Sequence, residues 1–155
     1  MLNDIIWRSI KRAQIPVRKE PTELVSGGKQ PDGVTMIPCA REKPLAWDVT
    51  VPDTYAESHI ISTSAEAGAA AKCAAAIKTT KYLDITSTHI FYPISIETAG
   101  SWEVQAVELM EDIERRTTVA TNDQNETMYL FQRISMAIQR GNTLSFFHTF
   151  HNDID

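Results

Sequence analysis

Two aspartates, Asp32 and Asp48, have the residue type and the spacing to bind one metal ion. Asp32 opens the segment DGVTMIP and Asp48 lies inside PLAWDVTV, so each sits on a short apolar stretch typical of a strand. Two strands joined by a short connection run antiparallel about 5 Å apart, so carboxylates on one face can share a hard divalent cation. This pattern favours metal-assisted cleavage of a phosphodiester. The competing interpretation is a pair of solvated aspartates at turns.

The length and composition indicate one ordinary domain. The 155 residues contain 43% hydrophobic residues, enough for a core that needs no disulfide or metal to fold. Cys39 and Cys73 lack the paired spacing of a zinc site, and the chain lacks a secretory signal pattern. The longest apolar run, residues 67–76, falls short of the roughly 18 residues of a membrane span. We therefore expect an intracellular protein, nuclear or cytoplasmic, without membrane partners.

The charge is divided unequally along the chain. The net charge of −5 argues against a free-standing, high-affinity nucleic-acid binder, because phosphate neutralisation dominates such affinity. Residues 1–43 hold eight Lys and Arg against five Asp and Glu, a balance of +3, whereas residues 44–155 hold seven against fifteen, a balance of −8. DNA binding by this chain is expected to be weak and to use the N-terminal basic residues, which are Arg8, Lys11, Arg12, Arg18, Lys19, Lys29, Arg41 and Lys43. A solvated basic face is the alternative.

Hydrophobic periodicity and turn residues predict an α/β fold. Helices are expected at 3–14, 63–79, 101–116 and 125–140, and strands at 16–20, 33–38, 44–51 and 89–97. The Thr63–Glu66 pattern indicates a capping box that opens the second helix, and Gly141 indicates the end of the last one. The resulting order is αβββαβ followed by two helices, in one domain over residues 1–155.

The chain resembles the PD-(D/E)XK nuclease superfamily in three features. These are this order of elements, a Pro-Asp before the second strand and an acidic residue inside the third strand. More narrowly, the chain resembles the restriction-enzyme-like endonuclease domain at the C-terminal end of some non-LTR retrotransposon polyproteins. The similarity spans nearly the whole chain through short motifs, which are LNDIIW at 2–7, KEP at 19–21, QPDG at 30–33, WDVTV at 47–51, KTTKY at 78–82 and ETAG at 97–100. It implies a restriction-endonuclease-like core with a mixed sheet flanked by helices, and two further C-terminal helices.

The resemblance also implies an activity and its partners. It implies a Mg²⁺-dependent (or Mn²⁺-dependent) DNA endonuclease that nicks target DNA to prime reverse transcription, with the reverse transcriptase upstream in the parent polyprotein. Asp32 and Asp48 would hold the metal, with Glu20 as a third ligand. The superfamily lysine is replaced by Thr50, which shares a strand face with Asp48.

On the same resemblance, a lysine on the following helix takes the catalytic role. Lys78 and Lys81 match the pattern, and Lys72 is a further candidate. The alternatives are that these lysines solvate a helix C-terminus and that Glu20 is a solvated strand-edge residue. For Glu97, after the fourth strand, a structural and a functional role both stay open. The pair His148 and His151 is expected to lie at a frayed helix end rather than to bind metal.

The chain begins at Met1, without the polymerase, and is expected to be a truncated C-terminal fragment. A non-catalytic nuclease-fold remnant or protein-interaction module is therefore the alternative function. A third possibility is an unrelated small α/β binding protein.

Overall fold

The computed structural model describes residues 2–21, 30–124 and 126–152, and it places the side chains of these residues except 126–128 and 146–152. The elements run in the order α1 (Leu2–Arg12), β1 (Val17–Lys19), β2 (Gly33–Thr35), β3 (Leu45–Thr50), α2 (Ile60–Ala65), α3 (Ala69–Lys81), a 3₁₀ turn (Leu83–Ser87), β4 (Ile90–Ser95), α4 (Val104–Thr121) and α5 (Glu126–Asn152). The predicted order is therefore present, with α2 as an addition.

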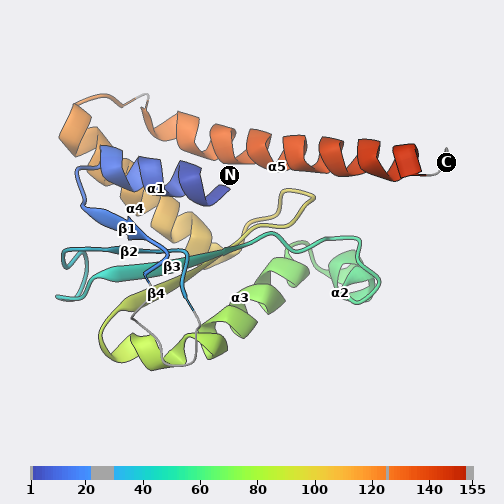
Figure 1. The fold of residues 1–155 in the computed structure, drawn as a ribbon, viewed down its shortest axis with the longest axis horizontal. Helices are drawn as coiled ribbons and strands as arrows, with labels where there is room; N and C mark the ends of the chain where they lie inside the picture. The colour runs from blue at the N-terminus through green and yellow to red at the C-terminus, as the bar shows by residue number, and fades with distance from the viewer. Residues whose placement is uncertain (1, 22–29, 125, 153–155) are drawn as a thin grey trace.

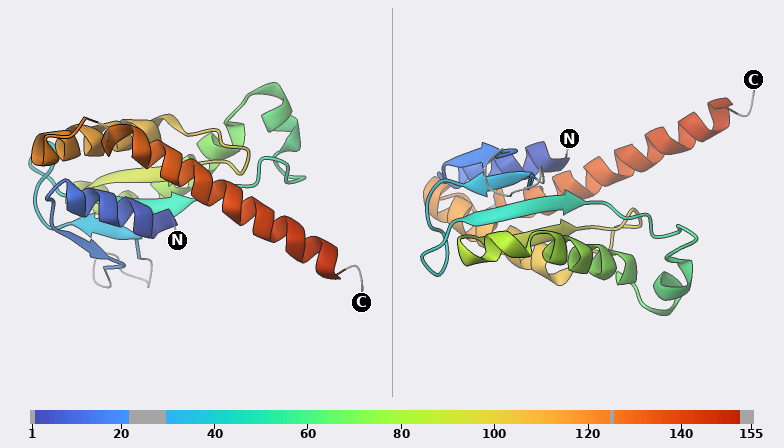
Figure 2. Two further views of the ribbon diagram at one scale, coloured as in Figure 1. Left: turned by 90° about the horizontal axis from the view of Figure 1, so that it is seen from above. Right: turned by 60° about the horizontal axis from the view of Figure 1, so that its bottom comes forward.

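The four strands form one mixed sheet in the order β1-β2-β3-β4. The first three strands are antiparallel neighbours, whereas β3 and β4 are parallel, so the chain must cross over between them. The crossover carries α3, which packs on β3 and β4 on one face of the sheet. Helices α1 and α4 cover the other face, and α5 lies across both of them (Figure 1 and Figure 2). The predicted α/β class with a mixed sheet flanked by helices is confirmed.

Each face of the sheet has its own apolar cluster. Because side chains alternate along a strand, Trp47 of β3 faces α1 and α4, while its neighbours Ala46 and Asp48 face α3. The larger cluster surrounds Trp47 and includes Ile6, Ile10, Ile94, Ile96, Leu109, Met110, Ile113 and Ile134. The smaller cluster on the α3 face consists of Val34, Ala46, Tyr82 and Ile85, with Phe91 beside it. An aspartate on β3 therefore faces α3 from the edge of an apolar patch.

Gly33 in β2 is required by packing. A Cβ atom at this position would lie 2.1 Å from Cζ2 of Trp47, a separation that no real side chain tolerates. The buried indole therefore lies directly over the backbone next to Asp32, and the core position of Trp47 helps to fix where Asp32 emerges.

The predicted start of the crossover helix was wrong. Thr63 lies within α2, and Glu66 is the C-terminal cap of that helix, so the Thr63–Glu66 pattern is not a capping box. Helix α3 begins after Gly68, which has a left-handed backbone with φ of 85°. The N–H groups of its first turn are instead satisfied by the carboxylate of Glu97, a partner remote in sequence.

The predicted end of the last helix was also wrong. Helix α5 continues through Gly141 to Asn152, because one glycine in a helix costs only about 1 kcal/mol and does not force an end. Buried Ile138 and the Asn142 side chain, whose Nδ2 donates to Thr98 O at 2.7 Å, anchor the helix around this glycine. Beyond this point α5 projects past the rest of the fold (Figure 1). His148 and His151 lie on this part, and their side chains are outside the described set.

The predicted bounds of β2 and α4 differ from the structure by a few residues, and α4 begins at Val104 rather than at residue 101. Strand β2 ends at Thr35 rather than at residue 38, and α4 runs on to Thr121, where Asn122 with φ of 56° closes it. Across the described ranges, no helix combines the length and the apolar character needed to cross a bilayer.

Candidate functional site

Asp32 and Asp48 lie opposite each other on the α3 face of the sheet. The antiparallel register pairs Gly33 with Trp47 and Val34 with Ala46, so the next residue outward on each strand brings the two aspartates together. Residues directly opposite in such a pair have Cβ atoms about 4.5 to 5.5 Å apart. The N–H of Asp32 donates to Trp47 O at 2.9 Å and holds this alignment one residue before the start of β2.

The backbone of Asp32 is held by two neighbouring segments. Its carbonyl oxygen accepts from Nδ2 of Asn3 and from the N–H of Glu20, each at 3.1 Å. The Asn3 Oδ1 in turn accepts from Nε1 of buried Trp47 at 2.9 Å. Helix α1 and the end of β1 therefore fix the position of this aspartate.

The Asp32 carboxyl group is held in a position that disfavours its charge. Partial burial raises its pKa above the usual value, and the neighbouring Asp48 carboxylate raises the pKa further. The N–H of Val49 donates to Asp32 Oδ2 at 2.7 Å and opposes this rise. Two carboxylates that repel each other at short range are the arrangement that a bound cation relieves.

Asp48 is buried and is neutralised by a lysine from α3. Its residue is 4% exposed, and Nζ of Lys78 lies 2.6 Å from its Oδ2. The Lys78 ammonium is the charged partner of this oxygen, and a carboxylate oxygen has two lone pairs. Oδ2 therefore keeps lone-pair capacity for another ligand.

The two predicted lysines have different environments. Lys78 lies three residues after buried Ala75 and seven after buried Ala71, so it continues the helix stripe that faces the sheet. Lys81 is exposed, and its Nζ lies 5.0 Å from the centroid of the Tyr82 ring. Lys72 is exposed as well. The structure brings only Lys78 of these three to the aspartate pair.

Tyr82 belongs to this site, although no pattern in the sequence assigned it a role. Its ring is buried, and its hydroxyl donates to Gln30 O at 2.8 Å, which ties the end of α3 to the segment before Asp32. Burial, and then the charge of Asp48, raise the pKa of Tyr82. Both Tyr82 and Asn3 join segments far apart in the chain, and no spacing in the sequence signals such contacts.

Glu20 is exposed and has a left-handed backbone with φ of 45°. It is linked to Asp32 by its backbone N–H, as described above. Among the side chains that the structure describes, in residues 2–21, 30–124 and 129–145, no three His, Cys, Asp or Glu are arranged to hold a metal ion. The geometry offers a pair of carboxylates, which is compatible with Mg²⁺, since this ion is usually bound by one or two carboxylates together with water and substrate oxygens.

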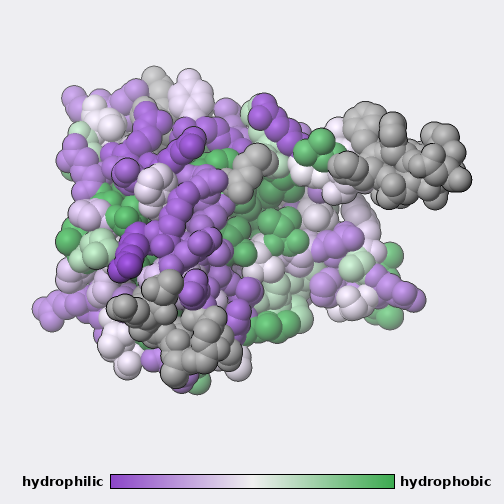
Figure 3. All heavy atoms as spheres, viewed as in Figure 1, coloured by the Kyte–Doolittle hydropathy of each residue, from purple (hydrophilic) through white to green (hydrophobic). Residues whose placement is uncertain are grey.

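The basic N-terminal residues lie mainly along α1 and β1. Nζ of Lys11 and Nζ of Lys19 lie 4.4 and 4.6 Å from the Trp7 ring centroid, and Lys19 also pairs with Asp4. Figure 3 shows hydrophilic side chains gathered over α1 and the neighbouring strands. Lys43 is directed elsewhere and donates to Thr86 O at 3.1 Å, and Lys29 lies outside the described residues. Of this surface, the end of β1 approaches the aspartates, through the Glu20 N–H that donates to Asp32 O, whereas α1 lies on the opposite face of the sheet.

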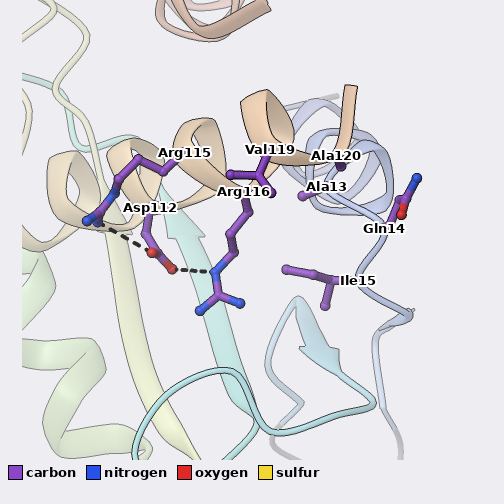
Figure 4. A pocket seen from close by; sticks show the side chains of 8 residues that line it. All are labelled: Ala13, Gln14, Ile15, Asp112, Arg115, Arg116, Val119 and Ala120. Atoms are coloured by element: carbon purple, nitrogen blue, oxygen red, sulfur yellow. Dashed lines mark hydrogen bonds and ion pairs between the residues drawn. The ribbon is translucent and has the colours of Figure 1, made fainter. Parts of the chain in front are cut away.

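A hollow of about 700 Å³ lies between the end of α1 and α4 (Figure 4). Its charged groups are engaged with their neighbours. Arg116 Nε lies 3.0 Å from Asp112 Oδ2, its Nη2 donates to Cys39 O at 2.6 Å, and Arg115 also pairs with Asp112. This hollow lies on the sheet face opposite the aspartates, so it is not part of their site.

No family model matches the sequence. A comparison with curated proteins likewise gives no significant match.

Proposed function

We propose that this chain is a metal-dependent DNA endonuclease domain of the restriction-endonuclease-like type, which nicks target DNA for retrotransposon integration. One observation carries the proposal: Lys78 reaches the buried Asp48 at 2.6 Å, from a helix that follows the two acidic strands, and Asp32 lies opposite Asp48. Two acids and a lysine from three separate elements thus converge on one point. The element order and the mixed sheet support the same fold type.

The aspartate pair fits a hard divalent cation. Both side chains supply carboxylate oxygens, and the mutual repulsion of the pair favours a positive ligand. Asp32 and Asp48 would hold Mg²⁺ or Mn²⁺, and the exposed Glu20 side chain, next to Asp32 along the backbone, is a candidate third ligand. When bound, the ion would supply Lewis-acid chemistry at a phosphate and ease the deprotonation of water.

Residues of the chain itself would stabilise the developing charge, hold Asp32 in position and contact the DNA. Lys78 carries a compact positive charge beside the acidic pair, where it offsets negative charge that builds up on a phosphate during cleavage. The Val49 N–H and the Asn3 side chain keep Asp32 in place as substrate binds. The basic residues of α1 and β1 would contact the DNA backbone, with affinity that falls as salt rises. In the parent protein, a reverse transcriptase would use the exposed 3′-hydroxyl.

The test is nicking of a supercoiled plasmid at increasing Mg²⁺ or Mn²⁺, with metal binding followed by calorimetry. We expect Asp32→Asn and Asp48→Asn to abolish nicking and weaken metal binding. Lys78→Met should slow nicking while metal affinity stays nearly intact. The control is Asp84→Asn, because Asp84 is an exposed acid in the 3₁₀ turn and should be dispensable. An equal loss in the control variant would contradict the proposed site.

A specific observation also favours the alternative of a non-catalytic module. Lys78 neutralises the buried Asp48 directly, as a purely structural ion pair would. A chain that neither binds the ions nor nicks DNA, yet loses stability on replacement of Lys78, would establish this second function class.

A further inference from the structure

Glu97 is a buried carboxylate that has no assigned role in the proposed reaction. It follows β4 and is 1% exposed. Its Oε1 accepts from the backbone N–H groups of Ala70 and Ala71 at 2.9 and 3.1 Å, and its Oε2 accepts from Thr54 Oγ1 at 3.0 Å. A buried carboxylate is costly unless donors surround it, and here three donors do so. The free-energy cost of burying Glu97 indicates that its three hydrogen bonds have a specific structural role.

The first turn of α3 depends on Glu97 for its cap. The residue at the N-cap position is Gly68, which has no side chain to accept the N–H groups of that turn. Glu97 supplies both the acceptor and the negative charge that a helix N-terminus favours. It thereby ties α3 to the end of β4, and through Thr54 to the segment after β3.

The cap also fixes where Lys78 lies on the sheet. Seven residues separate Ala71 from Lys78, which is two turns and about 10.5 Å along one stripe of the helix. The stripe contacts the sheet through alanines, Ala71 and Ala75, whose small side chains interlock little with the strands. A slip by one residue would move the helix by about 1.5 Å and turn it by about 100°, which carries Lys78 off the face that meets Asp48.

We propose that Glu97 is a positioning residue for Lys78, which sets the register of α3 on the sheet so that the Lys78 ammonium meets Asp48. The catalytic consequence rests on the proposed endonuclease function. The register itself does not, because it is a property of the folded chain.

The kinetic test uses Glu97→Leu, which removes the acceptor, and Glu97→Gln, which keeps an amide oxygen for Ala70 and Ala71. We expect Glu97→Leu to lower kcat for nicking about tenfold or more with little change in KM, and Glu97→Gln to recover most of the rate. In the Lys78→Met background, Glu97→Leu should add almost nothing, since both changes remove the same interaction. If Glu97→Leu lowered kcat by the same factor in the wild-type and in the Lys78→Met backgrounds, the inference would be overturned.

The matched control is Glu103→Leu. Glu103 caps α4 by accepting from the N–H of Gln105 at 2.8 Å, and α4 packs on the opposite face of the sheet. This variant removes a helix cap of the same chemical type, so it should lower stability without changing kcat. A kcat loss in Glu103→Leu equal to that in Glu97→Leu would mean that any lost cap suffices, and the inference would be wrong.

A second readout needs no nuclease activity. The ¹⁵N resonance of the Lys78 ammonium, assigned by its loss in Lys78→Met, should move to the position of a solvated lysine in Glu97→Leu and stay in Glu97→Gln. If Glu97→Leu does not fold, Thr54→Val replaces it, because it removes one of the three donors and should shift the resonance in the same direction. An unchanged resonance overturns the inference. A wild-type chain that does not nick DNA refutes the proposed function, while the resonance still decides the role of Glu97.

Discussion

Replacement of Lys78 by methionine should destabilise the fold, and the size of the loss can be worked from the site. At 2.6 Å and an effective dielectric constant of about 20, the direct attraction between Lys78 and Asp48 is about 6 kcal/mol. Desolvation of the two groups offsets most of this attraction, but their burial makes the loss of one partner costly, since Asp48 would stay behind. Removal of one partner of a buried pair typically costs about 3 to 5 kcal/mol.

The expected loss is smaller than that range because the Lys78 side chain is 26% exposed, so water already screens part of the pair. We expect Lys78→Met to lower the free energy of unfolding by about 2 kcal/mol at pH 7. For a domain of this length, that corresponds to a fall in Tm of about 4 to 8 °C. The cost should shrink at low pH, where the carboxyl group of Asp32, whose pKa is raised by burial and by the charge of Asp48, is protonated and the pair carries less negative charge.

The assay is urea unfolding of the wild type, of both single variants and of the Lys78→Met/Asp48→Asn double variant. The double-mutant cycle should give a coupling energy of about 1 to 3 kcal/mol. Lys81→Met is the matched control, because Lys81 is exposed and lies beside the Tyr82 ring rather than beside a buried acid, so its loss should cost less than about 0.5 kcal/mol. Equal losses in the two lysine variants, or zero coupling between Lys78 and Asp48, would refute the reasoning.

Three further predictions concern the surroundings of this pair. Because the folded state raises the pKa of Asp32 above its ordinary value of 3.8, its charged form destabilises the fold at pH 7, and Asp32→Asn should raise Tm at pH 7. In a pH series of thermal melts this gain should fade as the pH falls through the raised pKa and should be absent below the ordinary value of 3.8. Gly33→Ala should cost about 3 kcal/mol in urea unfolding, since its Cβ would collide with the Trp47 ring, whereas Gly141→Ala, with open space in a helix, should add about 1 kcal/mol. Lys11→Glu should weaken DNA binding in an anisotropy titration and reduce the salt slope by about one, and an unchanged slope would remove this residue from the DNA surface.

The sequence predicted local features well where the pattern was strong. The strand around Asp48 and the helix near the N-terminus were placed within two residues, because alternation and helical spacing each persist over the whole element. The start of α3 was misplaced for a physical reason, since its cap comes from Glu97, more than 25 residues away. The end of α5 was misplaced because packing on either side of Gly141 outweighs the small penalty of one glycine.

The sequence by itself determined that Asp32 and Asp48 stand on neighbouring strands and that lysines follow on a helix, because strand pairing and helix formation depend on short-range patterns. Only the tertiary structure decided that Lys78, and not Lys81, meets Asp48. That choice depends on the rotation and the register of α3 on the sheet, which are fixed by the buried alanine stripe and by Glu97. A change of about 100° around the helix axis separates one residue from the next, and only long-range contacts can set such an angle.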